Sequence, residues 1–148
     1  FKKVAEIVPP ILLLTSFSML LARSNGLFDD YIKSVDAIDS LKCGDNILIL
    51  ENCSHHPNCE DIGRVKIPNL LKKRCGFELN FDFIAGLDKI DDIKKYSLVI
   101  QCGGCMVTKR VLHNRIRPIV SAGIPIINYG MIIALLTGVY NRAIKPLL

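Results

Sequence analysis

Two cysteines separated by a pair of glycines end an apolar run in the sequence, "VIQCGGCM" over 99–106. Cys102 and Cys105 are candidate metal ligands or partners in a redox couple, because a thiolate binds metals and exchanges with disulfides. Gly103 and Gly104 carry no Cβ, so the backbone between the thiols can curve around a bulky ligand and present N–H groups to it. This stretch alone does not choose among a disulfide couple, a zinc site and an iron–sulfur site.

A second group of candidate ligands follows another apolar run, in the stretch "ILILENCSHH" over 47–56. It supplies one thiol, Cys53, and two imidazoles, His55 and His56. Ligands of an open parallel sheet bind beyond the carboxyl ends of its strands. If this run and the run before CGGC are neighbouring strands, three thiols and up to two imidazoles converge at one edge of the sheet, as a metal site requires.

Three convergent thiolates favour an iron–sulfur cluster, since such clusters are held by cysteine thiolates, usually four. We expect Cys53, Cys102 and Cys105 to be the metal ligands, with His55 as a fourth ligand or a residue just behind the ligands. An iron without a fixed fourth ligand would suit a carrier or assembly scaffold, because cargo must attach and leave. Two alternatives stay open: a zinc site of the same four residues, and a thiol–disulfide oxidoreductase that uses Cys102 and Cys105 alone.

Further residues are expected around these ligands. The last apolar run, "IPIINY" over 124–129, ends at the same edge of the predicted sheet. The residues expected to line a cargo site are Ser54, His56, Gly103, Gly104, Asn128 and Tyr129. Cys59 follows Cys53 closely and could be a spare ligand, but it fits a structural role better.

The elements that must position these residues alternate regularly along the chain. Unbroken apolar runs separated by helical patterns predict a compact, doubly wound α/β fold, with a mainly parallel sheet and helices on both faces. The predicted strands are 47–51, 77–83, 97–100 and 124–129, with a further strand end at 11–14. The predicted helices are 1–7, 17–26, 27–41, 68–76, 88–96, 106–123 and 131–144. Pro118 should kink its helix or end it early.

The N-terminal part of the chain reads as the end of another unit. Two prolines follow the first helical segment, and Gly26 closes the second, so we place a domain boundary there. The predicted division is 1–26 and 27–148. The sequence opens on Phe1 and not on a methionine, and we expect it to be a piece of a longer protein.

The composition predicts a packed domain whose partners are neither nucleic acids nor membranes. Half of the 148 residues are hydrophobic and 22% are charged. The net charge of +5 is scattered and only 7% of the residues are aromatic, so the stacking platforms and basic stripes of nucleic-acid-binding proteins are missing. No segment reaches the ~18 uninterrupted apolar residues of a membrane span. Arg64 and Lys66 either offset the charge of a cluster, dock a partner, or form a solvated face.

The six cysteines are expected to be reduced. Six cysteines in a small secreted protein would suggest three disulfides. Here the apolar composition supports a core without such bridges, and the strand–helix pattern is typical of cytosolic α/β proteins. We therefore expect the protein in the cytoplasm.

Four stretches of the chain resemble one known family in order along the sequence. "CSHHPNCEDIGRVKIP", "VIQCGGCM" and "AGIPIINYG" resemble the cluster-binding region of the [FeFe]-hydrogenase maturation GTPase, the HydF family. "LTSFSMLLARSNG" resembles that family's passage from dimerisation domain to cluster domain, which would make 1–26 the end of the dimerisation domain. The family's pattern is Cys-x-His followed by His-Cys-x-x-Cys. Gln101 stands where that pattern usually has histidine, so no imidazole ligand is available at 101.

The resemblance implies a [4Fe–4S] cluster on Cys53, Cys102 and Cys105. It implies a scaffold and carrier, not an enzyme, that receives the diiron precursor of the hydrogenase active site from two radical-SAM maturases and delivers it to the apo-[FeFe]-hydrogenase. It also implies a homodimer of the full-length protein. The family's GTPase domain would hold GTP, but this chain contains no GxxxxGK[ST] loop and therefore no assignable nucleotide site.

Overall fold

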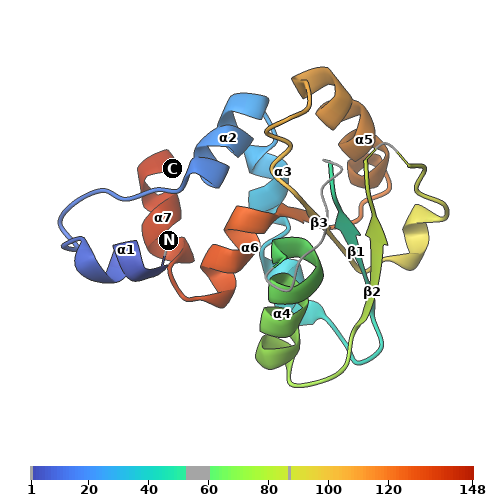
Figure 1. The fold of residues 1–148 in the computed structure, drawn as a ribbon, viewed down its shortest axis with the longest axis horizontal. Helices are drawn as coiled ribbons and strands as arrows, with labels where there is room; N and C mark the ends of the chain where they lie inside the picture. The colour runs from blue at the N-terminus through green and yellow to red at the C-terminus, as the bar shows by residue number, and fades with distance from the viewer. Residues whose placement is uncertain (1, 53–60, 87) are drawn as a thin grey trace.

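The computed structural model describes residues 2–52, 61–86 and 88–148. Within these residues, four strands form one parallel sheet in the order β2-β1-β3-β4 (Figure 1). The strands are β1 (Asn46–Leu50), β2 (Asn80–Ile84), β3 (Leu98–Gln101) and β4 (Ile126–Asn128). The predicted parallel α/β architecture is confirmed, and each of the four main apolar runs contains a strand.

The two central strands are the most apolar. Every residue of β3, and all of β1 except Asn46, is buried, as expected of strands covered on both faces. β2 is an edge strand and is only partly buried, which explains why its sequence alternates. In register, Leu50 of β1 lies beside Gln101 of β3, and Gln101 lies beside Asn128 of β4. The carboxyl ends of these three strands therefore meet at one edge.

Helices cover both faces of the sheet. They are α1 (Lys2–Ile7), α2 (Phe17–Asn25), α3 (Phe28–Lys33), α4 (Ile67–Cys75), α5 (Lys109–Ser121), α6 (Tyr129–Leu136) and α7 (Tyr140–Ile144). Short 3₁₀ turns lie at Asp36–Ser40, Ile93–Lys95 and Lys145–Leu147, and a π-helical turn at Ile62–Lys66 precedes α4. The crossovers β1-α4-β2 and β3-α5-β4 run in opposite directions across the sheet, so right-handed connections put α4 and α5 on opposite faces. α6 packs against α4.

Both predicted ends of the helix over 17–26 are confirmed, and each has a capping residue. The side chain of Ser16 accepts a hydrogen bond from the backbone nitrogen of Met19 and begins α2. Gly26, at φ +74°, ends the same helix in the left-handed conformation. Thr108 caps the start of α5 by accepting a hydrogen bond from Val111.

Some predicted elements are wrong in extent. The run 11–14 forms no strand, and its apolar side chains are mostly exposed after the turn that follows the two prolines. The segment 88–96 contains only the 3₁₀ turn at Ile93–Lys95, since its apolar residues are too few to anchor a longer helix. The predicted helix 27–41 is divided into α3 and the 3₁₀ turn Asp36–Ser40.

The last two helices also differ from their predictions. α5 begins at Lys109, not at 106, because the Thr108 cap determines its start. Pro118 lies inside α5, which continues to Ser121. The segment 131–144 is divided into α6 and α7 at Gly138, whose φ of +76° favours glycine and ends the helical path.

The N-terminal and C-terminal parts of the chain lie side by side (Figure 1). The guanidinium of Arg142 in α7 donates hydrogen bonds to the carbonyls of Ala5, Val8 and Pro9. In the same region α2 packs against α6, and Met19 is fully buried in the core. The division of the chain at residue 26 stays a prediction. None of the helices described is long and apolar enough to cross a membrane.

Candidate metal centre

The carboxyl edge of the sheet has a switch point between β1 and β3. From β1 the chain continues to α4 and on to β2, whereas from β3 it continues to α5 and on to β4, on the other side. At such a reversal the two connections leave a crevice, which is where open α/β sheets bind their ligands. β1 and β3 are hydrogen-bonded neighbours. The condition for convergence of the two cysteine motifs, that their strands are neighbours, is therefore met, although Cys53 itself lies outside the described residues.

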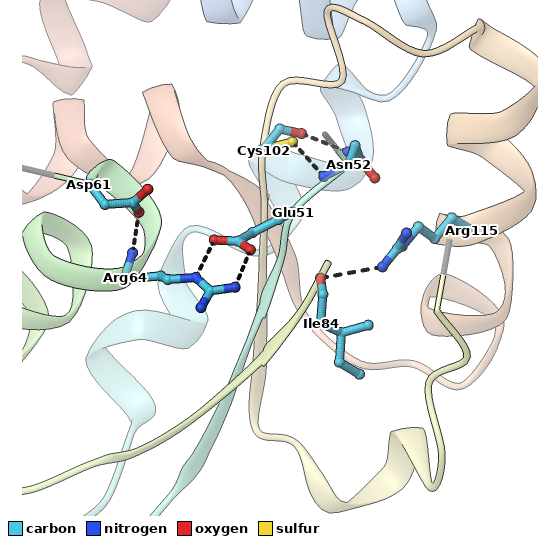
Figure 2. Close-up of polar contacts among 7 residues, drawn as sticks. All are labelled: Glu51, Asn52, Asp61, Arg64, Ile84, Cys102 and Arg115. Atoms are coloured by element: carbon cyan, nitrogen blue, oxygen red, sulfur yellow. Dashed lines mark hydrogen bonds and ion pairs between the residues drawn. The ribbon is translucent and has the colours of Figure 1, made fainter. Parts of the chain in front are cut away.

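Cys102 is the first residue after β3, and it is held by the chain that follows β1. Its backbone nitrogen donates to the carbonyl of Leu50 at 2.9 Å. Its Sγ accepts a hydrogen bond from the backbone nitrogen of Asn52 at 3.0 Å, and its carbonyl accepts one from Asn52 Nδ2 at 3.1 Å (Figure 2). A hydrogen bond to sulfur stabilises the thiolate, free or metal-bound.

The CGGC loop carries two free thiols, of which that of Cys102 is half-buried and that of Cys105 exposed. Gly104 has φ +67°, and a Cβ on it would lie 2.8 Å from Leu112 Cδ1. The nearest atom to a Cβ on Gly103 would be 3.5 Å away, an ordinary contact. The backbone conformation and the close contact thus require glycine at position 104 but not at position 103. Since α5 begins at Lys109, neither cysteine lies in the first turn of that helix.

Several predicted site residues lie outside the part of the chain that the structure describes. They are Cys53, Ser54, His55, His56 and Cys59. Their roles stay predictions. Among residues 2–52, 61–86 and 88–148, no group of three His, Cys, Asp or Glu side chains is placed to hold a metal ion. The described portion therefore supplies Cys102 and Cys105, together with Asn52, the residue before Cys53.

Asn128 and Tyr129 lie at the same edge, as predicted, but they differ in their contacts. Asn128 is buried. Its Oδ1 accepts a hydrogen bond from the backbone nitrogen of Met131 at 2.8 Å, and its Nδ2 donates one to the carbonyl of Ser18 at 3.1 Å. It thereby caps α6. The hydroxyl of Tyr129 is buried with no hydrogen-bond partner among the described residues. Burial raises the pKa of Tyr129, and negative charge at Cys102 raises it further.

An ion pair lies immediately beside this site. Glu51 follows β1 and its side chain is only 4% exposed. Arg64 donates from Nε and Nη2 to the two carboxylate oxygens at 3.0 and 2.8 Å (Figure 2). The hydrogen bonds with Glu51 raise the pKa of Arg64. The side chain of Asp61 holds the backbone of Arg64 in place by accepting a hydrogen bond from its nitrogen at 2.7 Å. Sequence analysis missed Glu51 as a site residue. The signal that could have found it is a charged residue directly at the end of a buried apolar strand.

Arg115 reaches the same edge from α5. Its Nη2 donates to the carbonyl of Ile84 at 3.4 Å, while its Nε and Nη1 are buried without hydrogen-bond partners among the described residues. Burial lowers the pKa of Arg115, and negative charge at Cys102 and Asp88 opposes that shift. Arg64 and Arg115 lie on opposite sides of the end of β1 (Figure 2). Nothing in the sequence distinguishes Arg115 from the other basic residues of its helix.

Gln101 ends β3 directly before Cys102 and is fully buried. Neither its Oε1 nor its Nε2 has a hydrogen-bond partner within the described ranges. Buried amides are almost always hydrogen-bonded, so this position holds an unused polar group next to a candidate ligand. This edge thus combines the two free thiols of Cys102 and Cys105 with hydrogen-bond donors such as the backbone nitrogen of Asn52.

The comparisons with known proteins identify one family. No curated protein matches the chain. A family model described as the hydrogen maturase F tetramerization domain matches residues 29–146, which include both cysteine motifs and the whole sheet. Since the match covers most of its length, the chain belongs to the hydrogen maturase F family, HydF.

Proposed function

We propose that the chain binds a [4Fe–4S] cluster through Cys53, Cys102 and Cys105, and acts as a scaffold or carrier for the diiron precursor of the [FeFe]-hydrogenase active site. Membership in the HydF family supports a role in hydrogenase maturation. The cluster and its cargo are the specific part of the proposal and go beyond family membership. The bound cluster would supply an iron to which cargo can attach and from which it can leave.

The observation that carries the proposal is the contact between Asn52 and Cys102. The backbone nitrogen of Asn52 donates to Cys102 Sγ at 3.0 Å, and Asn52 directly precedes Cys53. Strand pairing between β1 and β3 thus places Cys102 beside the residue that precedes Cys53. That is the arrangement a cluster with ligands from two strand ends needs.

The surrounding residues would support a bound cluster in distinct ways. Asn52 donates to the sulfur of one ligand, which lowers the electron density there. Gly104 allows the CGGC loop its left-handed turn. Gln101, an amide where the family pattern usually has histidine, leaves one iron without a fixed imidazole. These features favour a site that is open to exchange.

The partners follow from the same proposal. The apo-[FeFe]-hydrogenase would receive the cargo, and two radical-SAM maturases would supply it, in the cytoplasm. GTP would bind to the GTPase domain of the full-length protein. On this view residues 1–26 are the end of the dimerisation domain, and the chain itself is not an enzyme.

Self-association of the protein is part of the proposal, since the matching family model is named for tetramerization. An exposed apolar stretch near the N-terminus supports it, because soluble monomers seldom leave such stretches uncovered. Its exposed large side chains are Val4, Ile7, Ile11, Leu12, Leu13, Phe17 and Leu20. Light scattering at several protein concentrations would test this, and a strict monomer would contradict it.

The test of the cluster is anaerobic reconstitution with iron and sulfide, followed by metal analysis and EPR of the reduced protein. We expect about four irons per chain and a cluster signal, both lost in Cys53→Ala, Cys102→Ala and Cys105→Ala. Cys43→Ala is the matched control, because that exposed thiol precedes β1 at the opposite end of the sheet. Zinc alone would overturn the proposal in favour of a zinc site. A Cys53→Ala protein that behaves like the wild type would favour the thiol–disulfide oxidoreductase.

A further inference from the structure

A cavity of about 440 Å³ lies between α1, α2, α6 and the π-helical turn Ile62–Lys66. Small-molecule sites in proteins commonly have volumes of about 300–1,000 Å³. Within the described ranges, the charged residues that line the cavity are three lysines and no acidic residue: Lys2, Lys3 and Lys66. Neither cysteine of the CGGC loop lines it, so this cavity is not the candidate metal centre.

The three lysines bring positive charge to the cavity that the protein itself offsets only in part. Lys2 lies 4.0 Å from Glu6 in the same helix, and the two side chains are 60% and 62% exposed, so this ion pair is weak. Lys3 and Lys66 form no ion pair within the part of the chain that the structure describes. An ammonium group donates hydrogen bonds and accepts none. The lysines therefore favour an anion as the ligand of the cavity.

The other walls of the cavity combine hydroxyls with apolar side chains. Ser16 and Ser18 line it from α2, and Ile133 and Ala134 line it from α6. The Ser16 hydroxyl oxygen accepts a hydrogen bond from the backbone nitrogen of Met19 at 3.3 Å, which leaves its hydrogen available to a ligand. A ligand that uses both kinds of wall has an anionic group next to an apolar group.

The helix that carries two of the lysines is held in place by Arg142. None of the residues of α1 is buried, so its own packing anchors it weakly. The guanidinium of Arg142 donates hydrogen bonds to the carbonyl of Ala5 in α1, and to the carbonyls of Val8 and Pro9 directly after it, the last two at 2.7 Å. Figure 1 shows α1 beside α7, the helix that carries Arg142. This arginine therefore fixes one wall of the cavity.

We propose that the cavity binds an organic phosphate, with the phosphate group on Lys3 and Lys66 and the organic group against Ile133 and Ala134. A phosphate group carries about 1.5 to 2 negative charges near neutral pH and has three strong acceptor oxygens, which suits several lysines better than a carboxylate does. Lysine is a frequent phosphate ligand in proteins. Inorganic phosphate alone would leave the apolar wall without a contact. This inference does not depend on the proposed cluster.

The test is an NMR titration of the isotope-labelled chain, without added metal, with phenyl phosphate, inorganic phosphate and phenol as separate probes. We expect phenyl phosphate to shift the amide signals of Ser16, Ser18 and Gly130, which line the cavity. It should bind about fivefold or more tightly than inorganic phosphate, and phenol should bind more weakly than both. Added salt should weaken phenyl phosphate binding. Equal affinities for phenyl phosphate and inorganic phosphate, or no binding of either, would overturn the proposal.

Two lysine variants test whether binding takes place in this cavity. Lys3→Gln and Lys66→Gln should each weaken phenyl phosphate binding about fivefold or more, because each removes a charge-assisted hydrogen bond. Lys73→Gln is the matched control, since Lys73 is an exposed lysine of α4 that does not line the cavity. The wild-type amide spectrum shows whether each variant is folded. Affinities of Lys3→Gln and Lys66→Gln equal to that of Lys73→Gln would overturn the proposal.

The positioning role of Arg142 has its own test. Arg142→Met should weaken phenyl phosphate binding in the otherwise unchanged chain, because α1 is released. The same substitution should have little effect in Lys2→Gln/Lys3→Gln, where α1 no longer carries the lysines that Arg142 positions. An equal loss of affinity in the two backgrounds would overturn this role of Arg142.

Discussion

The ring of Tyr129 lies directly against the backbone of Gly63. A Cβ on Gly63 would lie 2.9 Å from Tyr129 Cζ, and the hydroxyl oxygen would be closer still. Gly63 belongs to the π-helical turn Ile62–Lys66, whose start is capped by the side chain of Asp61. Turns of this type often occur at functional sites. The absent side chain at 63 is therefore what allows the Tyr129 hydroxyl its buried position.

Gly63→Ala should destabilise the protein by about 1–3 kcal/mol, because the added methyl group overpacks a buried contact. Denaturant unfolding of the metal-free protein measures this. Gly103→Ala is the control and should stay within about 0.5 kcal/mol, since it has room for a Cβ and no positive φ. Removal of the hydroxyl in Gly63→Ala/Tyr129→Phe should restore part of the stability. Equal stability of Gly63→Ala and wild type would contradict the contact.

Gly104→Ala should lower both stability and iron content. Its φ of +67° costs an alanine about 1–2 kcal/mol, and the new Cβ would meet buried Leu112. The loop between Cys102 and Cys105 would have to shift, and the two thiols would move away from the positions they have in the structure. Gly103→Ala again serves as the comparison and should load iron normally. The same iron content in the two variants would show that the turn at 104 is not needed.

The ion pair Glu51–Arg64 should contribute more to the free energy of unfolding than the ion pair Asp39–Arg74. Arg64→Met leaves a carboxylate that is only 4% exposed without its cation, and we expect a loss of about 1–3 kcal/mol. A fully buried pair would lose about 3–5 kcal/mol, but Arg64 is 37% exposed. Arg74→Met breaks a pair exposed on both sides and should cost less than about 1 kcal/mol. Similar losses from both variants in denaturant unfolding would refute the distinction.

All four tyrosines of the chain should resist ionisation in the folded protein. Burial raises the pKa of Tyr31, Tyr96, Tyr129 and Tyr140 above the ordinary value of about 10. In spectrophotometric titration, phenolate should form at higher pH in native protein than in protein unfolded by denaturant. Because the folded pKa values are the higher ones, stability should be fully present below about pH 10 and fall as the pH rises further. Matching titration curves would contradict the burial of these hydroxyls.

Gln101→His should close the exchangeable position of the proposed cluster. The substitution puts an imidazole directly before Cys102, in the place where the family pattern usually has histidine. We expect nitrogen coupling in pulsed EPR of the reduced cluster and weak or absent binding of added imidazole. Gln101→Leu, which is similarly buried but has no ligand atom, should keep the position open. Unchanged imidazole binding to Gln101→His would show that residue 101 does not reach the iron.

The fold could be predicted from the sequence because its central strands are unbroken apolar runs. Ile47–Leu50 and Leu98–Ile100 are buried on both faces of the sheet. Because both faces must be apolar, each of these strands is an unbroken apolar run in the sequence. The run 11–14 carried a similar signal and was wrong, since an apolar run does not show whether a neighbouring strand is there to pair with it. Helix ends were predicted well at Ser16 and Gly26, where one side chain or one backbone angle decides the boundary.

The candidate site could be predicted only in part. The spacing of Cys102 and Cys105 follows from local sequence, whereas the contact of Cys102 with Asn52, the residue before the predicted ligand Cys53, was found only in the structure. Arg115 could not be found in this way, because its approach to the site depends on how α5 crosses the sheet. The contact between Tyr129 and Gly63 likewise joins segments that are distant in sequence, and no local pattern reports it.

The pairing of β1 with β3 has a consequence for how the protein is made. Asn52 and Cys102 are fifty residues apart, and the segment between them includes β2, which pairs with the other edge of β1. Contacts between such distant segments form late and slowly in folding, because a long loop must be closed first. A partly folded chain in which β1 and β3 are unpaired lacks the contact between Asn52 and Cys102, so metal uptake at the proposed site would report that the sheet has formed.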